Sequence, residues 1–315
     1  MKLREFLKKN YLLLALVLIT IFFGIASKGK LFYAGNIVNL FQQNMYVFIL
    51  SSGMFIGILT GGNTDLSCGS AVCLLGAIGF RMMEKGIGGA VAFLAMLMIG
   101  ALIGLLHGYL IGRFRLPSII VTLASMSIIR GIANLILGGY TLSVSDETYL
   151  TLFSISKGFP FYFVFVLLCV LAAVYISEFA PLGKHIYALG GNRHSAKISG
   201  ISEAKIIIFA YIFMGILTAI AAGVVTGRMG IVGPGLGETY AMDAIAACFI
   251  GGTAVSGGKG KMSGVIMGAL LMGIINQGMS IMGLSANYQN VIKGIILVLA
   301  VLSGYLLNRE GDKQQ

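Results

Sequence analysis

The chain has 315 residues, of which 57% are hydrophobic and only 10% are charged, and its net charge is +11. A mean hydropathy of +0.94 excludes an ordinary soluble domain of this length and indicates a polytopic membrane protein. The basic residues are spread over loops and chain ends without an aromatic cluster, so membrane orientation explains the charge better than nucleic-acid binding does.

The first apolar run, Tyr11–Ala26, follows four basic residues and predicts a transmembrane helix with a cytoplasmic N-terminus. The next stretch, Ser27–Asn44, mixes apolar and polar residues as amphipathic surface segments do. Nine further apolar runs predict spans at Met45–Thr60, Leu66–Met82, Gly88–Ile111, Ser118–Leu137, Phe161–Ser177, Ile206–Thr226, Ala241–Val255, Gly264–Gly283 and Val291–Leu307. Threading these ten spans from the inside places most Lys and Arg residues in the cytoplasm. We therefore expect an all-α, single-domain membrane protein over residues 1–315, with some short or broken spans and both termini cytoplasmic.

Two stretches, residues 60–69 and 251–260, interrupt the apolar pattern with glycines and hydroxyl side chains. Irregular backbone at membrane depth is tolerated only where protein covers it or water reaches it. Such broken segments are candidates for lining a translocation path. The residues that we single out in them are Asp65, Ser67, Gly251, Gly252 and Thr253.

Few ionisable residues lie within the spans. Arg130 is about a dozen residues into its helix, hence about 18 Å from the cytoplasmic face at 1.5 Å per residue. A charge at that depth usually faces the bundle interior and pairs with an acid. We expect Arg130 to pair with Asp243, and Lys293 to extend to the outer surface. Asp65 can also be the N-cap of the third predicted span, and Asp243 a favourable charge at the start of the eighth.

Catalytic chemistry finds little support. The three histidines lack metal-ligand spacing, and no glycine-lysine pair has the surroundings of a nucleotide-binding loop. The four cysteines lie in apolar runs and are expected to be small buried side chains. We expect no enzymatic activity and no metal or cofactor on this chain, so ATP, if used, would bind another subunit.

The stretch Phe179–Ile206 is a polar, basic island between two apolar runs. Its charge fixes it on the cytoplasmic side of the membrane. Pro181 is expected to break the preceding helix, Gly190–Asn192 to form a turn with an N-cap, and Arg193–Ser199 to form a short helix that Gly200 ends. A short helix held at the membrane surface suits docking of a cytoplasmic partner, and an ordinary solvated connection fits the spacing equally well.

Four motifs carry a family resemblance, and in chain order they are Gly61–Gly69, Leu189–Ile201, Tyr240–Ala247 and Gly251–Gly260. With them, the chain resembles the permease subunits of bacterial monosaccharide ABC importers of the ribose, galactose, arabinose and xylose type, from about Met45 to its C-terminus. The resemblance implies a multi-pass permease in the bacterial cytoplasmic membrane that works by alternating access. It implies a second permease copy or paralogue, a cytoplasmic ABC ATPase that holds ATP and Mg, and an extracytoplasmic sugar-binding protein.

The resemblance also implies that the basic island is the loop that couples to the ATPase. The family pattern there is Glu-Ala-Ala, three residues and Gly, and this chain replaces the Glu and the first Ala by His194 and Ser195. The expected coupling residues are Gly190, Gly191, Asn192, Arg193, His194, Ser195, Ala196, Lys197 and Gly200. The candidates for the translocation path or its gates are Asp65, Ser67, Arg130, Asp243, Gly251, Gly252 and Thr253.

Alternatives stay open at this point. Permeases for nucleosides or for signalling sugars are close relatives of the same family. An ion-coupled secondary transporter would need acids within its spans, which are scarce here. A polytopic membrane enzyme would need a catalytic constellation.

Overall fold

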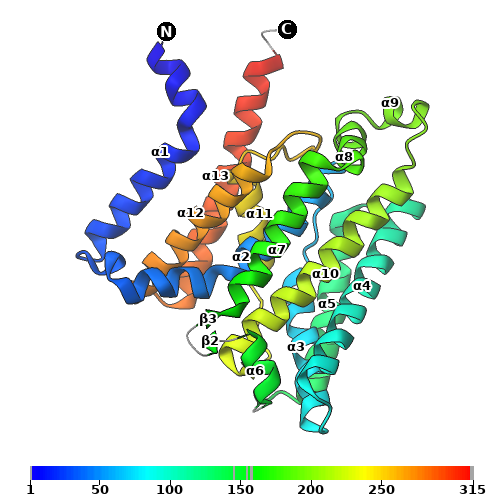
Figure 1. Cartoon of the computed structure of the whole chain (residues 1–315). Helices are drawn as coiled ribbons and strands as arrows, with labels where there is room; N and C mark the ends of the chain where they lie inside the picture. Colours follow the sequence, from blue (N-terminus) through cyan, green and yellow to red (C-terminus); the bar gives the residue numbers. More distant parts are fainter. Residues whose placement is uncertain (1, 145, 154, 157–158, 313–315) are drawn as a thin grey trace.

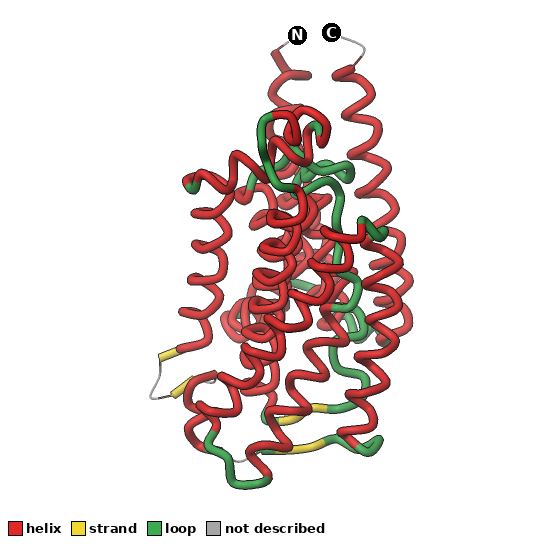
Figure 2. The backbone as a smooth tube through the Cα atoms, turned by 90° about the vertical axis from the view of Figure 1, so that its right-hand side faces the viewer, coloured by secondary structure: helices red, strands yellow, loops and turns green. Residues whose placement is uncertain are grey.

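The computed structural model describes residues 2–144, 146–153, 155–156 and 159–312, and these are almost entirely helical (Figures 1 and 2). Side chains are described for residues 12–144, 146–153 and 161–302. The helices are α1 (Lys2–Ala26), α2 (Ala34–Leu59), α3 (Cys68–Glu84), α4 (Gly89–Phe114), α5 (Ser118–Leu137), α6 (Glu147–Phe153), α7 (Phe161–Val174), α8 (Pro181–Gly191), α9 (Arg193–Ile198), α10 (Glu203–Met229), α11 (Tyr240–Ile250), α12 (Met262–Ile281) and α13 (Ala286–Asp312), with the helical turns η1 (Lys30–Phe32) and η2 (Tyr175–Phe179).

The two ends of the bundle differ. The start of α1, the end of α13 and the pair α8 and α9 lie together at one end, here called the α9 end (Figure 1). At the other end, here called the strand end, β1 (Leu142–Ser143) pairs antiparallel with β4 (Ile231–Val232). A second antiparallel pair, β2 (Ile155–Ser156) with β3 (Phe159–Pro160), lies at the same end (Figure 2).

Helix α10 is the centre of the bundle and packs against α4 and α2. Its contact with α4 rests on glycines spaced four residues apart, which share one helix face. A Cβ atom placed on Gly100 would lie 2.5 Å from the carbonyl oxygen of Gly215, and one on Gly104 would lie 2.1 Å from that of Tyr211. Gly108 and Gly112 meet α10 in the same way further along. Only glycine lets the two backbones approach so closely, as in other membrane helix pairs.

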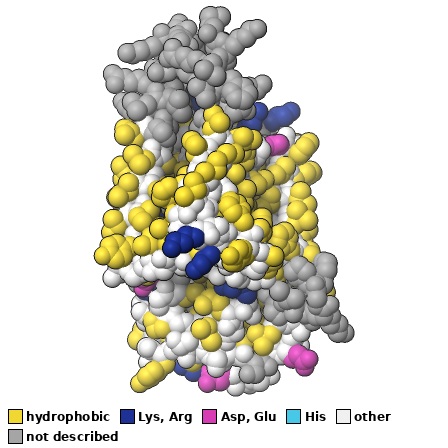
Figure 3. Space-filling model, turned by 90° about the vertical axis from the view of Figure 1, so that its left-hand side faces the viewer, with side chains coloured by type: hydrophobic (Ala, Val, Ile, Leu, Met, Phe, Trp, Pro, Cys, Tyr) yellow, Lys and Arg dark blue, Asp and Glu magenta, His cyan; other side chains and the backbone are white. Residues whose placement is uncertain are grey.

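The peripheral helices carry apolar side chains outward, as a bilayer requires, and Figure 3 shows hydrophobic side chains over much of one face. In the described residues, five segments are long and apolar enough to cross a membrane: α4, α5, Phe161–Phe179, α10 and α12. Shorter apolar segments are Leu12–Ala26, Tyr240–Ile250 and Ala286–Leu302. Each overlaps an expected span, and the remaining two expected spans fall on α2 and α3. A multi-pass membrane protein is confirmed, whereas the number of ten spans stays a prediction.

Helix boundaries agree unevenly with expectation. Helix α5 begins and ends at Ser118 and Leu137 as predicted. The predicted break between a surface segment and a span at Met45 is wrong, because α2 is continuous from Ala34 to Leu59. The change in composition marks where this helix becomes buried: its first residues are mostly exposed, and from Asn44 onward they are nearly all buried.

The basic island is more helical than predicted. Pro181 does not merely end the preceding helix but occupies the first position of α8, which runs to Gly191. Proline suits that position because its ring fixes φ and its missing N–H would have no helical partner there. The predicted turn therefore shrinks to Asn192, which is confirmed as the N-cap of α9. Gly200 has φ of 79° just after that helix, as a terminating glycine should.

All four cysteines are free and buried, as expected: Cys68, Cys73, Cys169 and Cys248. In the described part of the chain, no group of three or more His, Cys, Asp or Glu side chains is placed to hold a metal ion.

Candidate functional site

At the α9 end, three glycine-rich segments meet: the end of α2, the end of α8 and the loop between α11 and α12. The amide of Gly258 donates to the carbonyl oxygen of Leu59 over 3.1 Å. A Cβ atom placed on Gly190 would lie 1.9 Å from that same oxygen. One placed on Gly257 would lie 2.6 Å from the backbone nitrogen of Gly61. We call this contact the glycine junction, and it joins the two broken segments predicted from sequence directly to the basic island.

Helix α9 projects from this junction. The side chain of Asn192 accepts a hydrogen bond from the amide of Ser195 at 3.0 Å, which satisfies one of the free donors at the helix start. The Arg193 guanidinium donates to Glu203, at the start of α10, over 3.0 Å. A Cβ atom placed on Gly61 would lie 2.9 Å from the Nη2 atom of the same guanidinium. Side-chain contacts thus hold α9 against both α10 and the break after α2.

Most of α9 faces outward. Of the coupling residues predicted there, Ala196 is buried, whereas His194, Ser195 and Lys197 are exposed. Sequence reasoning missed Ile198, whose side chain is 75% exposed. A large apolar side chain on an otherwise polar surface helix is a signal for a protein contact that could have been read from the sequence.

Helix α8 holds the loop between α11 and α12. The Tyr187 hydroxyl donates to the carbonyl oxygen of Gly260 at 2.8 Å. Burial, and secondarily the negative charge of Glu178, raise the pKa of Tyr187 above its ordinary value, which keeps the hydroxyl a proton donor. Of the predicted residues in this loop, Gly251 packs against the backbone of Gly264, and Thr253 is buried with no partner for its hydroxyl among the described residues.

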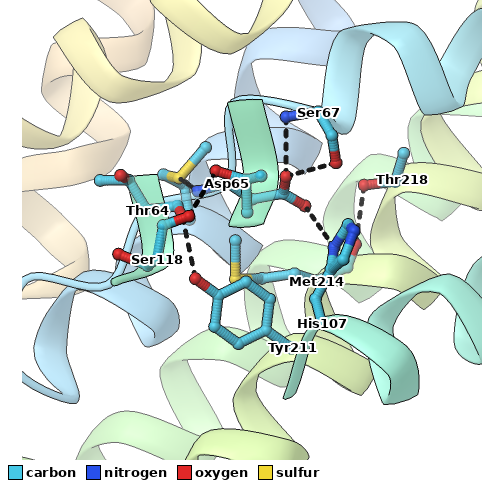
Figure 4. Close-up of polar contacts among 10 residues, drawn as sticks. Thr64, Asp65, Ser67, His107, Ser118, Tyr211, Met214 and Thr218 are labelled. Atoms are coloured by element: carbon cyan, nitrogen blue, oxygen red, sulfur yellow. Dashed lines mark hydrogen bonds and ion pairs between the residues drawn. The ribbon is translucent and has the colours of Figure 1, made fainter. Parts of the chain in front are cut away.

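The break after α2 is organised by Asp65 (Figure 4). Its carboxylate accepts hydrogen bonds from the amide and the hydroxyl of Ser67, at 2.8 and 2.6 Å. The expectation that Asp65 is the N-cap of the next helix is wrong, because Ser67 holds the N-cap position of α3 and Asp65 braces it. His107 brings its Nδ1 within 4.0 Å of the other carboxylate oxygen. Asp65 and His107 are 5% and 1% exposed, so this carboxylate does not face open solvent in this conformation.

Tyr211 of α10 supports the same break. Its hydroxyl donates to the carbonyl oxygen of Thr64 at 2.9 Å, and Figure 4 shows the ring reaching up from α10 to that backbone. The irregular backbone of residues 60–67 is buried or partly buried, as backbone at membrane depth can be where protein covers it or water reaches it.

A second acid, Asp243, lies in a buried polar network between α2, α11, α12 and α13. It accepts hydrogen bonds from the Tyr46 hydroxyl at 2.5 Å and from the Lys293 ammonium at 2.9 Å. Asn276 lies beside Tyr46, which stacks on Tyr240 with 3.7 Å between ring centroids. The predicted pair of Asp243 with Arg130 is therefore wrong. The expectation that Lys293 extends to the outer surface is also wrong, since Lys293 is 6% exposed and its ammonium group pairs with Asp243 inside the bundle.

Arg130 instead binds backbone. Its Nη1 donates to the carbonyl oxygens of Pro234 and Leu236, at 2.8 and 2.7 Å. These belong to the segment Gly233–Thr239, here called the strap, between β4 and α11. The strap also meets the start of α3, where a Cβ on Gly69 would lie 2.0 Å from the carbonyl oxygen of Gly237. Two carbonyl oxygens thus take the place of the acid that we expected, because a guanidinium has five N–H donors and can bond both.

Two cavities flank the strap at the strand end. One, of about 420 Å³, is lined by Leu66, Gly69, Ser70, Met126, Ser127, Arg130, Asn134 and residues of the strap. The other, of about 480 Å³, is lined by the strap with Thr141, Met229, Ile231, Tyr240, Ala286, Gln289, Asn290 and Lys293. The strap therefore separates two hollows that both carry hydroxyl, amide and charged side chains.

The predicted residues fall in three places rather than in one site. The coupling residues, Gly251, Gly252 and Thr253 lie at the α9 end. Asp65 and Ser67 lie in the break before α3, and Arg130 and Asp243 lie on opposite sides of the strap. The arrangement has a surface helix at one end, polar hollows at the other and covered, irregular backbone between them.

Comparison with known proteins finds similar transport proteins. Residues 36–301 match the family described as branched-chain amino acid transport system / permease component. The chain is 35% identical over 276 residues to the ribose import permease protein RbsC of Escherichia coli K12, with 86% of each chain covered. It is 32% identical to the xylose transport system permease protein XylH of Haemophilus influenzae, covering 92% of this chain and 94% of that one. It is 31% identical to the D-allose transport system permease protein AlsC of Escherichia coli, covering 93% and 90%. No solved structure matches the chain.

Proposed function

Because the chain belongs to this family of transport permease components, it is a transport subunit rather than an enzyme, and we propose that it carries a monosaccharide across the bacterial cytoplasmic membrane. The substrate class rests on relatives whose names specify ribose, xylose and allose. The polar hollows at the strand end suit a solute rich in hydroxyl groups, since they offer amide, hydroxyl and charged side chains without a tight charged site.

The α9 end faces the cytoplasm in this proposal. The basic residues of α8 and α9 favour that side. A cytoplasmic ABC ATPase, which holds ATP and Mg, docks on α9 through the exposed Ile198 and its polar neighbours. A second copy or a paralogue of the permease completes the path, and an extracytoplasmic sugar-binding protein delivers the sugar at the strand end.

The glycine junction carries the mechanism. Backbone packed directly on backbone leaves no side chain to deform, so a displacement of α8 and α9 reaches the end of α2 and the loop after α11 together. Closure of the ATPases would push α9, and the two broken segments would transmit the push toward Asp65 on one side and α11 on the other. This is alternating access driven through irregular backbone rather than through a side-chain relay.

The strap is the outer gate in this scheme. Arg130 holds it through two carbonyl oxygens, and the polar network of Asp243 and Lys293 holds the start of α11 next to it. Release of the strap would join the two hollows that it separates.

The test is uptake by the assembled transporter. The permease, its partner ATPase and its binding protein would be reconstituted in liposomes and offered labelled ribose, xylose, allose, a nucleoside and a signalling sugar. ATP-dependent uptake of a monosaccharide is the expected result. Preferential uptake of the nucleoside would move the substrate class, and uptake driven by an ion gradient without the ATPase would overturn the proposal.

A further inference from the structure

A third cavity lies at the α9 end, between α1, α8 and the loop that leads into α12. Its volume is about 630 Å³, and it is lined by Leu12, Leu13, Tyr187, Gly251, Gly252, Lys259, Gly260, Lys261, Ser263, Gly264 and Met267. None of these lining residues is acidic. The glycines leave the floor of the cavity without side chains, while Leu12, Leu13 and Met267 supply apolar walls from two different helices.

The charge in this cavity is uncompensated. Lys259 and Lys261 are both exposed, and neither forms a hydrogen bond through its side chain or an ion pair within the described residues. Lys261 is the N-cap of α12, and its side chain makes no capping bond. The first turn of α12 holds no acidic residue, so the positive end of the helix dipole adds to the two lysine charges. Together these groups attract an anion.

The walls decide which anion. Leu13 is 52% exposed, and the same face of α1 continues one and two turns further along with Val17 and Ile21, which are 42% and 51% exposed. A free phosphate ion would use the lysines but gain nothing from this apolar surface. A phospholipid would use both, with its headgroup at the lysines and an acyl chain along α1.

We propose that this cavity binds the phosphate headgroup of an anionic phospholipid from the leaflet at the α9 end. Lys259 and Lys261 neutralise the phosphate, the start of α12 and the Ser263 hydroxyl offer hydrogen bonds, and the leucines of α1 hold the acyl chain. This assignment depends on the membrane location of the protein and not on which solute it carries.

The position of the cavity gives the lipid a consequence. Gly260 lies between the two lysines and accepts the hydrogen bond from Tyr187 of α8. The same loop supplies Gly257 and Gly258 to the glycine junction. A bound headgroup therefore fixes the loop against which α8 and α9 are held, and we expect anionic lipid to stabilise the α9 end of the permease.

The chain contains its own control. Lys28-Gly29-Lys30 repeats the sequence Lys-Gly-Lys found at Lys259–Lys261, but it lies between α1 and α2 and lines none of the cavities described above. The variant Lys259→Gln/Lys261→Gln removes the charge at the cavity, and Lys28→Gln/Lys30→Gln removes the same charge elsewhere. Both variants replace exposed lysines with uncharged polar side chains, so folding should stay intact.

The experiment uses the isolated full-length permease in mild detergent, without the ATPase. Its melting temperature would be followed while phosphatidylglycerol, phosphatidylcholine or inorganic phosphate is added, and native mass spectrometry would count retained lipids. Of the three additions, we expect only phosphatidylglycerol to raise the melting temperature. The cavity variant should need at least tenfold more of this lipid for half of the effect, and the control variant should behave as the parent does.

Three outcomes would overturn the proposal. Equal stabilisation by inorganic phosphate would identify an anion site that ignores the lipid chain. An unchanged lipid response in the cavity variant would place lipid binding elsewhere. Equal stabilisation by phosphatidylcholine would show that the apolar wall, and not the lysine charge, selects the lipid.

Discussion

The two ends of this permease are held together by different kinds of contact. At the α9 end, the glycine junction packs backbone on backbone between Gly190, Leu59 and Gly258. At the strand end, the strap is held mainly by side chains: Arg130 clamps two of its carbonyls, and Lys293 reaches Thr239 as well as Asp243. The tightest contact at the α9 end lies between backbones, whereas long side chains hold most of the strap and only Gly237 packs on the backbone of Gly69.

The difference fits the two tasks proposed for them. A part that receives a push must move without deforming, and close backbone contact achieves this because interiors are dense and poorly compressible. A gate must open and close, and a few side-chain bonds to carbonyls can be exchanged for bonds to water in adjoining cavities at small net cost. Substitutions at the two ends should therefore fail in different ways.

The largest effect is expected at the buried charge pair. Lys293→Met leaves the Asp243 carboxylate buried without its cation, and breaking a buried pair in this way costs about 3–5 kcal/mol. The melting temperature in detergent should fall strongly. The double variant Lys293→Met/Asp243→Asn should recover most of the loss, because no unpaired charge remains. A double variant as unstable as the single one would show that the charge pair is not what matters there.

The second prediction separates two adjacent glycines. Gly190→Ala places a methyl group against the Leu59 carbonyl oxygen, whereas Gly191→Ala points into open space. Overpacking of this kind costs about 1–3 kcal/mol. Gly190→Ala should lower the melting temperature and uncouple ATP hydrolysis from uptake, while Gly191→Ala should melt as the parent does. Equal effects of the two substitutions would contradict the backbone contact at the glycine junction.

The third prediction concerns the strap. Arg130→Met removes two hydrogen bonds, but water in the flanking cavities can solvate the freed carbonyls, so stability should fall by only about 1 kcal/mol. Function should change more: a loosened gate predicts leak of sugar from loaded liposomes without ATP. Arg130→Lys should leak less, since one ammonium can still reach one carbonyl. If liposomes that carry Arg130→Met do not leak sugar, the strap is not part of the gate.

The smallest effect is expected at the cap of α9. Asn192→Ala loses the bond to the Ser195 amide, worth about 0.5 kcal/mol on an exposed helix of six residues. Global melting should barely move, but affinity for the ATPase should fall two- to threefold because α9 frays. Asn192→Asp, which can still cap, should bind the ATPase normally. If the Ala variant also binds normally, α9 does not need to be preformed.

Sequence reasoning succeeded where the signal was local. The bounds of α5 follow from a mainly apolar run of 20 residues, and the short helix α9 follows from a capping residue and a terminating glycine. It failed where partners lie far apart in the chain. We expected an acidic partner for Arg130 because a charge inside a membrane needs compensation. Carbonyl oxygens of an irregular backbone segment provide that compensation instead. No pattern of residue types in the sequence predicts such a contact.

The glycine junction was out of reach for a similar reason. The glycines were visible as breaks, but nothing in the sequence says that residues 59, 190 and 258 touch. That contact is made by backbone where side chains are absent, so it leaves no hydrophobic pattern in the sequence from which the partner could be predicted.

The close contact of Gly100, Gly104, Gly108 and Gly112 of α4 with α10 has a practical consequence. Two helices so closely apposed move as one body, so a pair of spectroscopic labels with one on each should keep its separation throughout the transport cycle. Such a pair would serve as an internal ruler. Distances between labels placed across the strap, or between α9 and α1, could then be compared with this constant distance. A change in them alone would come from the transport cycle and not from an effect of the detergent.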